Sequence, residues 1–197
     1  MERMVEPEDR DLPLRRVFEE LEAEFEAGLR HEAEQEAVAA IRAEVGATPL
    51  WEQLARRIGA DGVVRAGSRT LRGTVVASYP DFFALQGHDG GQHLIRFPAV
   101  SVALPPGRAA LQPAPDRGQR RYHLALALRE LARQREPVRV ELADGDTAEG
   151  TIEAVGSDYL ELAEHEIGEA RREAAVRARR FAAFAAIAFV SLLPERR

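Results

Sequence analysis

Five arginines close together near the C-terminus could contact a phosphate backbone. They are Arg171, Arg172, Arg177, Arg179 and Arg180. Glu169 and Glu173 are the main opposing charges in the same segment. A loop of this composition could follow a nucleic-acid strand and become ordered on binding. The alternative is a solvated surface loop, or one that pairs with the glutamates of the N-terminal segment.

An acidic residue followed by an aromatic one occurs twice, as Asp81-Phe82 and as Asp158-Tyr159. Such a pair could form a base-stacking step, since stacking of a base on an aromatic ring contributes about 1–3 kcal/mol. The alternative is that the aspartate caps a turn and the ring fills the core. The repetition favours this structural role, because fold maintenance predicts the same residue types in both copies.

The remaining polar clusters do not form a pattern typical of catalysis. His88, Asp89 and His93 could ligate a metal, but their spacing matches no known ligand motif, so an exposed turn is favoured. The chain has no cysteine and no G-x-S-x-G motif. We therefore expect no metal, no cofactor and no enzymatic activity.

Composition narrows the class of protein further. The formal net charge is −6, which argues against a general nucleic-acid binder. The first residues are polar and acidic, unlike a signal peptide. The most apolar run, Phe181 to Leu193, is shorter than the roughly 20 residues that span a bilayer. We expect a soluble, cytoplasmic protein with no membrane contact.

The elements that carry these residues occur twice along the chain. Leu54-Ala55-Arg56 recurs as Leu131-Ala132-Arg133, an offset of 77 residues. Gly73 and Gly150 have the same offset, as do Asp81 and Asp158. Phe97 to Val100 then matches Phe184 to Ile187 at an offset of 87, so the second copy has about ten extra residues, assigned to a loop over 168–178. An internal repeat predicts a duplicated structural unit.

Each copy is predicted to be a helix followed by about five short strands. Helices are expected from Thr48-Pro49 onward and over 119–135. Alternation and turn residues predict strands over 63–66, 69–78, 81–86, 93–104, 138–142, 147–155, 159–166 and 179–193. A segment rich in proline and glycine, 105–118, separates the copies. Five strands of this size with a glycine in the second are typical of a small barrel.

A long acidic helix precedes both copies. Its apolar stripe consists of Leu14, Phe18, Leu21, Phe25 and Leu29. Ala37, Val38, Ile41 and Val45 are interpreted as its continuation, with a bend or break near Gly28. The helix is longer than a small barrel is wide, so we expect part of the stripe to contact a protein partner.

The final predicted strand is apolar on both faces. Phe184, Ala186, Ala188 and Val190 alternate with Ala183, Ala185, Ile187 and Phe189. A strand of this kind is covered on both sides. One face would fill its own barrel, and the other requires the helix, the sister barrel or another chain.

The motifs of the second copy resemble the Sm/LSm small-barrel family. Val138 to Gly145, Gly150 and Asp158 to Leu162 are similar to its first motif, and Phe184 to Val190 lies where its second motif would lie. The first copy matches through Gly67, Gly73, Asp81 and Phe97 to Val102. The chain also resembles uncharacterised proteins of high-GC bacteria with an acidic helix and one such barrel. The resemblance implies a helix and a bent five-stranded barrel in each copy, and family members pair the edges of neighbouring barrels.

The family's RNA-binding residues are not present here. Members that bind uridine-rich RNA have an asparagine shortly after the aspartate, and an Arg-Gly or Lys-Gly pair in the second motif. Glu161 and Ala185-Ala186 occupy these positions in the second copy, and Ala84 and Pro98-Ala99 in the first. Asp158 and Tyr159 are the only pocket positions that match, so the resemblance transfers the fold and not the RNA pocket.

The sequence thus predicts a mainly β protein with two Sm-like five-stranded barrels, each preceded by a helix. The expected segments are a helical region over 1–47, the first unit over 48–104, a linker over 105–118 and the second unit over 119–197. The predicted function is a non-enzymatic interaction or assembly module, whose partner is another protein or a second copy in a homodimer. The alternative is an RNA- or DNA-associated regulator that uses the arginine-rich loop.

Overall fold

The computed structural model describes residues 12–98, 100–103, 113, 115–116, 118–165 and 176–192. The chain divides into two compact units, Met1–Thr48 and Pro49–Arg197. Within the described residues, no helix combines the length and apolar composition needed to cross a lipid bilayer.

The first unit contains one helix, α1 (Leu12–Ala47), which continues through Gly28 without a break. This continuity corrects the interpretation of its apolar residues. A helix turns by about 100° per residue, so Phe25 and Ile41, sixteen positions apart, lie on nearly opposite sides. Val38, Ile41 and Val45 therefore form a second stripe and do not extend the stripe of Phe25.

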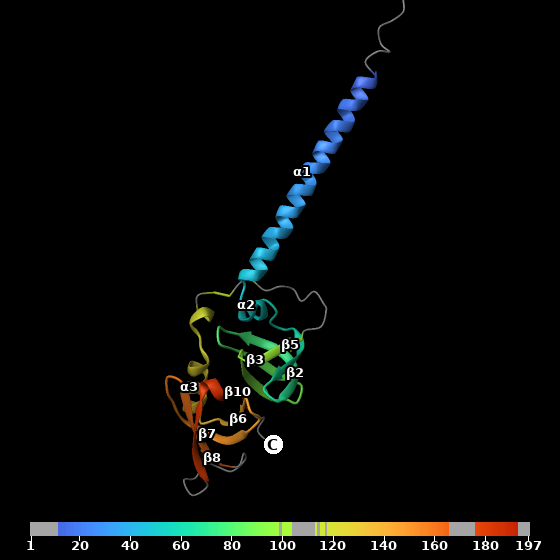
Figure 1. The fold of residues 1–197 in the computed structure, drawn as a ribbon. Helices are drawn as coiled ribbons and strands as arrows, with labels where there is room; N and C mark the ends of the chain where they lie inside the picture. Colours follow the sequence, from blue (N-terminus) through green and yellow to red (C-terminus); the bar gives the residue numbers. More distant parts are fainter. Residues whose placement is uncertain are drawn as a thin grey trace, which may run out of the picture. The chain divides into compact units, whose positions relative to one another are not determined.

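The second unit is built on one antiparallel sheet of ten strands, in the order β5-β1-β2-β3-β4-β10-β6-β7-β8-β9. The strands from the first copy are β1 (Asp61–Ala66), β2 (Arg69–Ser78), β3 (Phe82–Gly87), β4 (Gln92–Arg96) and β5 (Val100–Ala103). Those from the second copy are β6 (Pro137–Leu142), β7 (Thr147–Val155), β8 (Tyr159–Glu164), β9 (Ala178–Ala183) and β10 (Ile187–Leu192). Figure 1 shows the two sets in sequence colours, teal to green and then orange to red.

The five strands of each copy form what we call a half-sheet, and both half-sheets have the order fifth, first, second, third, fourth. The β2–β3 ladder shifts register between Val75 and Ala77, and the β7–β8 ladder shifts at the equivalent Ile152 and Ala154. A β-bulge bends its strand, so both copies bend at the same place. The internal repeat is therefore a repeat of structure.

Gly73 and Gly150 show why the repeat preserves a glycine in the second strand. A Cβ atom on Gly73 would lie 2.1 Å from the carbonyl oxygen of Gln86, and one on Gly150 would lie 1.9 Å from that of Ala163. Real Cβ atoms essentially never approach this closely. Only glycine lets the neighbouring strand come so near.

A short helix precedes each half-sheet. These helices are α2 (Leu50–Ala55) and α3 (Leu124–Gln134), the latter after a 3-10 turn, η2 (Gln119–Arg121). Leu124, Leu128 and Leu131 form the buried face of α3, as their spacing predicts. The Thr48 hydroxyl donates to the carbonyl of Glu44 in α1, and the N-cap of α2 is Pro49, which makes no side-chain capping bond.

The mainly β architecture with preceding helices is confirmed, but the expected pair of closed five-stranded barrels is not found among the described residues. Among the described residues no ladder joins β4 to β5 or β9 to β10, and the strands form one open sheet. The extended stretches 93–104 and 179–193 each divide into two strands. Phe97-Pro98 separates β4 from β5, and a 3-10 turn, η4 (Phe184–Ala186), separates β9 from β10. The fifth strand can therefore leave its neighbour and pair elsewhere.

The junction between the half-sheets is the ladder of β4 with β10, in which Leu94 lies opposite Val190. Each core extends across it. Phe82 of β3 belongs to the core that contains Leu128 and Val190, while Ala188 and Phe189 of β10 belong to the core that contains Phe83 and Ile95.

The prediction that the last strand is covered on both faces is confirmed for Ile187 to Val190, and the sister half-sheet provides the second cover. It is wrong for Ala183, Ala185 and Ala186, which are exposed at the end of β9 and in the 3-10 turn. The predicted alternation also fails, because the register shift between Ile187 and Phe189 places Ala188 and Phe189 in the same core.

Candidate interaction surface

Three residues of the first half-sheet make contacts across the junction. Phe82 is 1 % exposed and packs near Tyr122, with 6.2 Å between the ring centroids. Leu94 packs against the same core of the second half-sheet. The carboxylate of Asp81 accepts the backbone N–H of Leu124, at 3.2 Å to each oxygen.

The equivalent residues of the second half-sheet lie at the far end of the sheet. Asp158 and Tyr159 are identified by the offset of 77 residues. Phe181 is equivalent to Leu94, because it lies opposite Glu161 in β8 as Leu94 lies opposite Ala84 in β3. Asp158 is exposed, Tyr159 is 39 % exposed and Phe181 is 66 % exposed. We call Asp158, Tyr159 and Phe181 the terminal patch.

The local structure holds the aromatic rings of the terminal patch together. Tyr159 and Phe181 lie on neighbouring strands, with ring centroids 5.7 Å apart and an interplanar angle of 55°. The Tyr159 ring also covers Gly156, where a Cβ atom would lie 2.4 Å from the ring. The pair is thus held in place as an exposed apolar surface at the edge strand β9.

The arginines described beside this patch contact carboxylates of the same chain. Arg179 Nε lies 3.0 Å from Glu153 Oε2. Arg180 bonds to Glu164, and its Nη1 lies 2.7 Å from Asp146 Oδ2. Arg180 lowers the pKa of Asp146, and the hydrogen bond to Glu164 raises the pKa of Arg180. These pairs reduce the charge available to a phosphate backbone.

The other members of the arginine-rich loop are described less fully. Arg177 is exposed, and its backbone N–H bonds to the carbonyl of Glu164 at 2.8 Å. Arg171 and Arg172 lie outside the described residues, so the loop as a whole stays a prediction.

His88, Asp89 and His93, the residues considered as metal ligands, contact other residues of the sheet. His93 is buried, and its Nδ1 lies 2.8 Å from the Ser191 hydroxyl across the junction. Asp89 Oδ1 lies 3.5 Å from His93 Nε2, whereas His88 points to Asp61, 3.4 Å away. Among the described residues, no group of three or more potential ligands could hold a metal ion.

Of the predicted interface on α1, the structure describes the side chain of Phe25 only. Phe25 is 69 % exposed. The side chains of Leu14, Phe18, Leu21 and Leu29 lie outside the described part. Ile41 and Val45, on the other side of α1, are 61 % and 59 % exposed.

Sequence reasoning selected Asp158 and Tyr159 but missed Phe181. The signal was available, since the offset of 87 places Phe181 where the first copy has Leu94. To recognise Phe181 from the sequence, the register of β9 had to be known, and β9 follows a loop whose length differs between the copies.

No protein-family model matches this chain, and no curated protein matches it significantly.

Proposed function

We propose that this chain is a non-enzymatic assembly module built on two Sm-like units, with the terminal patch as its protein-binding surface. The identical strand order and equivalent bulges of the half-sheets support the duplication. The acidic net charge and the absence of a catalytic motif in the sequence support a binding role.

One observation carries the binding proposal. Phe82 is buried and Leu94 is partly buried against the neighbouring half-sheet, whereas the equivalent Tyr159 and Phe181 are exposed. Paired aromatic rings contribute strongly to protein interfaces because they bury large areas with few rotatable bonds. A further half-sheet, or a surface of similar shape, would cover them.

The test is site-specific photo-crosslinking in cells that naturally make the protein. A photoreactive amino acid replaces Phe181 in one variant and Val76 in a control, since Val76 is also exposed, at 47 %, on β2. We expect a discrete protein adduct from position 181 and none from position 76. Equal crosslinking at both positions, or none at either, would contradict the proposal.

The alternative, a nucleic-acid regulator, is less favoured because Arg179 and Arg180 already contact carboxylates. Fluorescence anisotropy with mixed-sequence RNA and single-stranded DNA tests it at low and physiological salt. We expect no binding that weakens steeply with salt. Micromolar binding that Arg179→Gln and Arg180→Gln together abolish would make the alternative the better description.

A further inference from the structure

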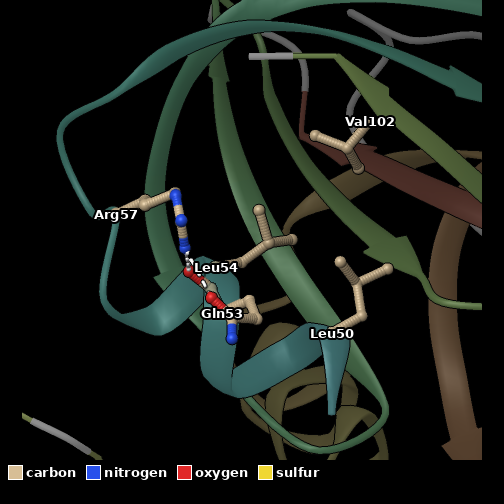
Figure 2. Close-up of a pocket in the computed structure, with 5 residues that line it drawn as sticks. All are labelled: Leu50, Gln53, Leu54, Arg57 and Val102. Carbon is tan, nitrogen blue, oxygen red and sulfur yellow. Dashed lines mark hydrogen bonds between the residues drawn. The ribbon is translucent and has the colours of Figure 1, made fainter. Parts of the chain in front are cut away.

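An apolar pocket of about 230 Å³ is lined by α2 and β5 of the first half-sheet. Its apolar wall consists of Leu50 and Leu54 of α2 and Val102 of β5 (Figure 2). Leu54 is 2 % exposed and belongs to the core that contains Phe83, whereas Leu50 is 48 % exposed. The pocket is therefore anchored on the core at one side and open to solvent at the other.

The polar side chains of the pocket belong to Gln53 and Arg57, which are bonded to each other beside Leu54 (Figure 2). Arg57 Nη1 donates to the backbone carbonyl of Gln53 at 2.7 Å and to its Oε1 at 2.8 Å. Since a guanidinium group has only donors, the amide oxygen of Gln53 faces it and the amide nitrogen is left to donate elsewhere. The polar side of the pocket thus offers donors to a ligand.

Arg57 has donors that no described residue uses. Gln53 takes both hydrogens of Nη1, so the adjoining Nε–H and Nη2–H form a fork of two donors, and no described carboxylate bonds to it. The two bonds to Gln53 also hold the guanidinium group in place, which reduces the entropy lost when an anion binds. The second copy has Gln134 at this position, so the cation is particular to the open pocket.

In the second copy, an aliphatic side chain covers the equivalent surface. The equivalents of Leu54 and Val102, by repeat offset and by strand register, are Leu131 and Val190. Both belong to a core against which Leu94 of the first half-sheet packs. The same apolar surface is therefore filled by an alkyl group in one copy and lines an open pocket in the other.

The volume of the pocket limits the size of its ligand. A cavity of about 150 Å³ accommodates about six carbon atoms, as in benzene. The pocket therefore fits an alkyl chain of roughly five to eight carbon atoms. It is smaller than the roughly 300 Å³ at which pockets for drug-sized ligands begin. The donor fork matches the two oxygens of a carboxylate.

We propose that the pocket between α2 and β5 binds a small aliphatic carboxylate. The alkyl chain lies against Leu50, Leu54 and Val102, and the two oxygens accept the Nε–H and Nη2–H of Arg57. This site goes beyond the assembly function and does not depend on it, because the pocket and the terminal patch are on different half-sheets.

Isothermal titration calorimetry of the full chain with hexanoate, at constant ionic strength, tests the proposal. The fluorescence of Trp51 provides a second signal, since it is the only tryptophan of the chain and follows Leu50 in α2. Acetate and butanoate shorten the alkyl chain of the probe, and 1-hexanol removes its charge. The series therefore separates the contribution of the apolar wall from that of the arginine.

Two variants, each with a matched control, locate the binding. Arg57→Gln removes the fork, and Arg72→Gln removes an exposed arginine from β2. Leu50→Ser removes part of the apolar wall, and Val76→Ser removes an apolar side chain of similar exposure, 47 %, from β2. Unchanged thermal unfolding is the folding control. Arg57→Lys, which keeps the charge without the fork, and Leu50→Ala are the replacements if a first variant unfolds.

We expect hexanoate to bind the wild type with a Kd between about 0.1 and 1 mM. From butanoate to hexanoate, each methylene group should tighten binding about fourfold, which corresponds to about 0.8 kcal/mol. The wild type should bind 1-hexanol at least about tenfold more weakly than hexanoate, and Arg57→Gln should weaken hexanoate binding by at least the same factor. Leu50→Ser should weaken it at least about threefold, and both control variants should match the wild type.

Three results would overturn the inference: no saturable binding of hexanoate up to about 10 mM, an affinity that does not rise with chain length, or equal losses in Arg57→Gln and Arg72→Gln. Equal affinities for 1-hexanol and hexanoate would also reject it, because the pocket would then take apolar groups without regard to charge.

Discussion

Phe82 and Tyr159 occupy equivalent positions in the two half-sheets, yet Phe82 is 1 % exposed and Tyr159 is 39 % exposed. The difference arises from the neighbours of each residue in the sheet. Phe82 packs against the second half-sheet, whereas Tyr159 lies at the end of the sheet and packs on Phe181. The same position is therefore buried in a shared core in one copy and exposed in the other.

This relationship predicts unequal effects of truncation on stability. Phe82→Ala should lower the free energy of unfolding by about 3–5 kcal/mol, because it leaves a cavity in a shared core. Tyr159→Ala should lower it by less than about 1 kcal/mol, because the ring is partly exposed. Urea denaturation followed by circular dichroism measures both values, and equal losses would contradict the assignment of the two roles.

Gly150→Ala should destabilise the sheet by at least about 1–3 kcal/mol, since its methyl group would overlap the carbonyl oxygen of Ala163. Gly28→Ala is the control, because nothing lies within 4 Å of the added atom in α1. It should increase helicity, as alanine is favoured over glycine by about 1 kcal/mol in a helix. Urea midpoints and far-ultraviolet circular dichroism test these expectations, and a neutral Gly150→Ala would show that the strands can separate at little cost.

Glu141 should be a site where replacement raises stability. Its side chain is buried in β6, its Oε1 accepts a hydrogen bond from Ser68 at 3.3 Å, and its Oε2 has no hydrogen-bond partner within the described residues. A buried oxygen without a partner costs about 1–3 kcal/mol. Glu141→Met should therefore raise the thermal unfolding temperature by a few degrees.

The matched control for this prediction is Glu149→Met. Glu149 bonds to Arg139 at the partly exposed face of the neighbouring strand, at 2.6 Å from Oε1 to Nε. Ion pairs of this kind contribute about 0–1 kcal/mol, so the change should be small. A lower unfolding temperature for Glu141→Met would indicate that the carboxyl group is stabilising where it lies.

The junction should weaken at acidic pH because of His93. Burial lowers the pKa of His93, and the charge of Asp89 offsets this in part. The unfolded chain then binds a proton near the ordinary value of 6.5 while the folded chain does not. Stability should fall as the pH decreases through that value, and the loss should stop growing below the lowered pKa of the folded state.

Thermal unfolding of the wild type and of His93→Gln between pH 8 and pH 5 measures this contribution, because the other histidines are common to both chains. The difference between the two chains should change with pH in the stated direction. Asp89→Asn should increase the acid sensitivity, since it removes the charge that raises the pKa of His93. A pH-independent difference would exclude His93 as the titrating group.

Much of the secondary structure could be predicted because its signals are local. The alternation over 69–78 and 147–155 matches β2 and β7, and the stripe of Leu124, Leu128 and Leu131 matches the buried face of α3. The repeat was visible because both copies need a glycine under the neighbouring strand. The apolar character of the final strand also predicted that Ile187 to Val190 are covered on both faces, but not the 3-10 turn and the register shift that interrupt it.

The sequence by itself determined the duplication, the helix-and-strand content and the candidate residues Asp158 and Tyr159, because these depend on side-chain spacing within a few residues. Only the tertiary structure decided that β4 pairs with β10 and that the half-sheets share one open sheet. It also decided that Phe82 is buried while Tyr159 and Phe181 are exposed. These outcomes depend on backbone pairing between residues almost a hundred positions apart, such as Leu94 and Val190. Which of two equivalent surfaces meets a neighbour is set by the position of each copy in the sheet.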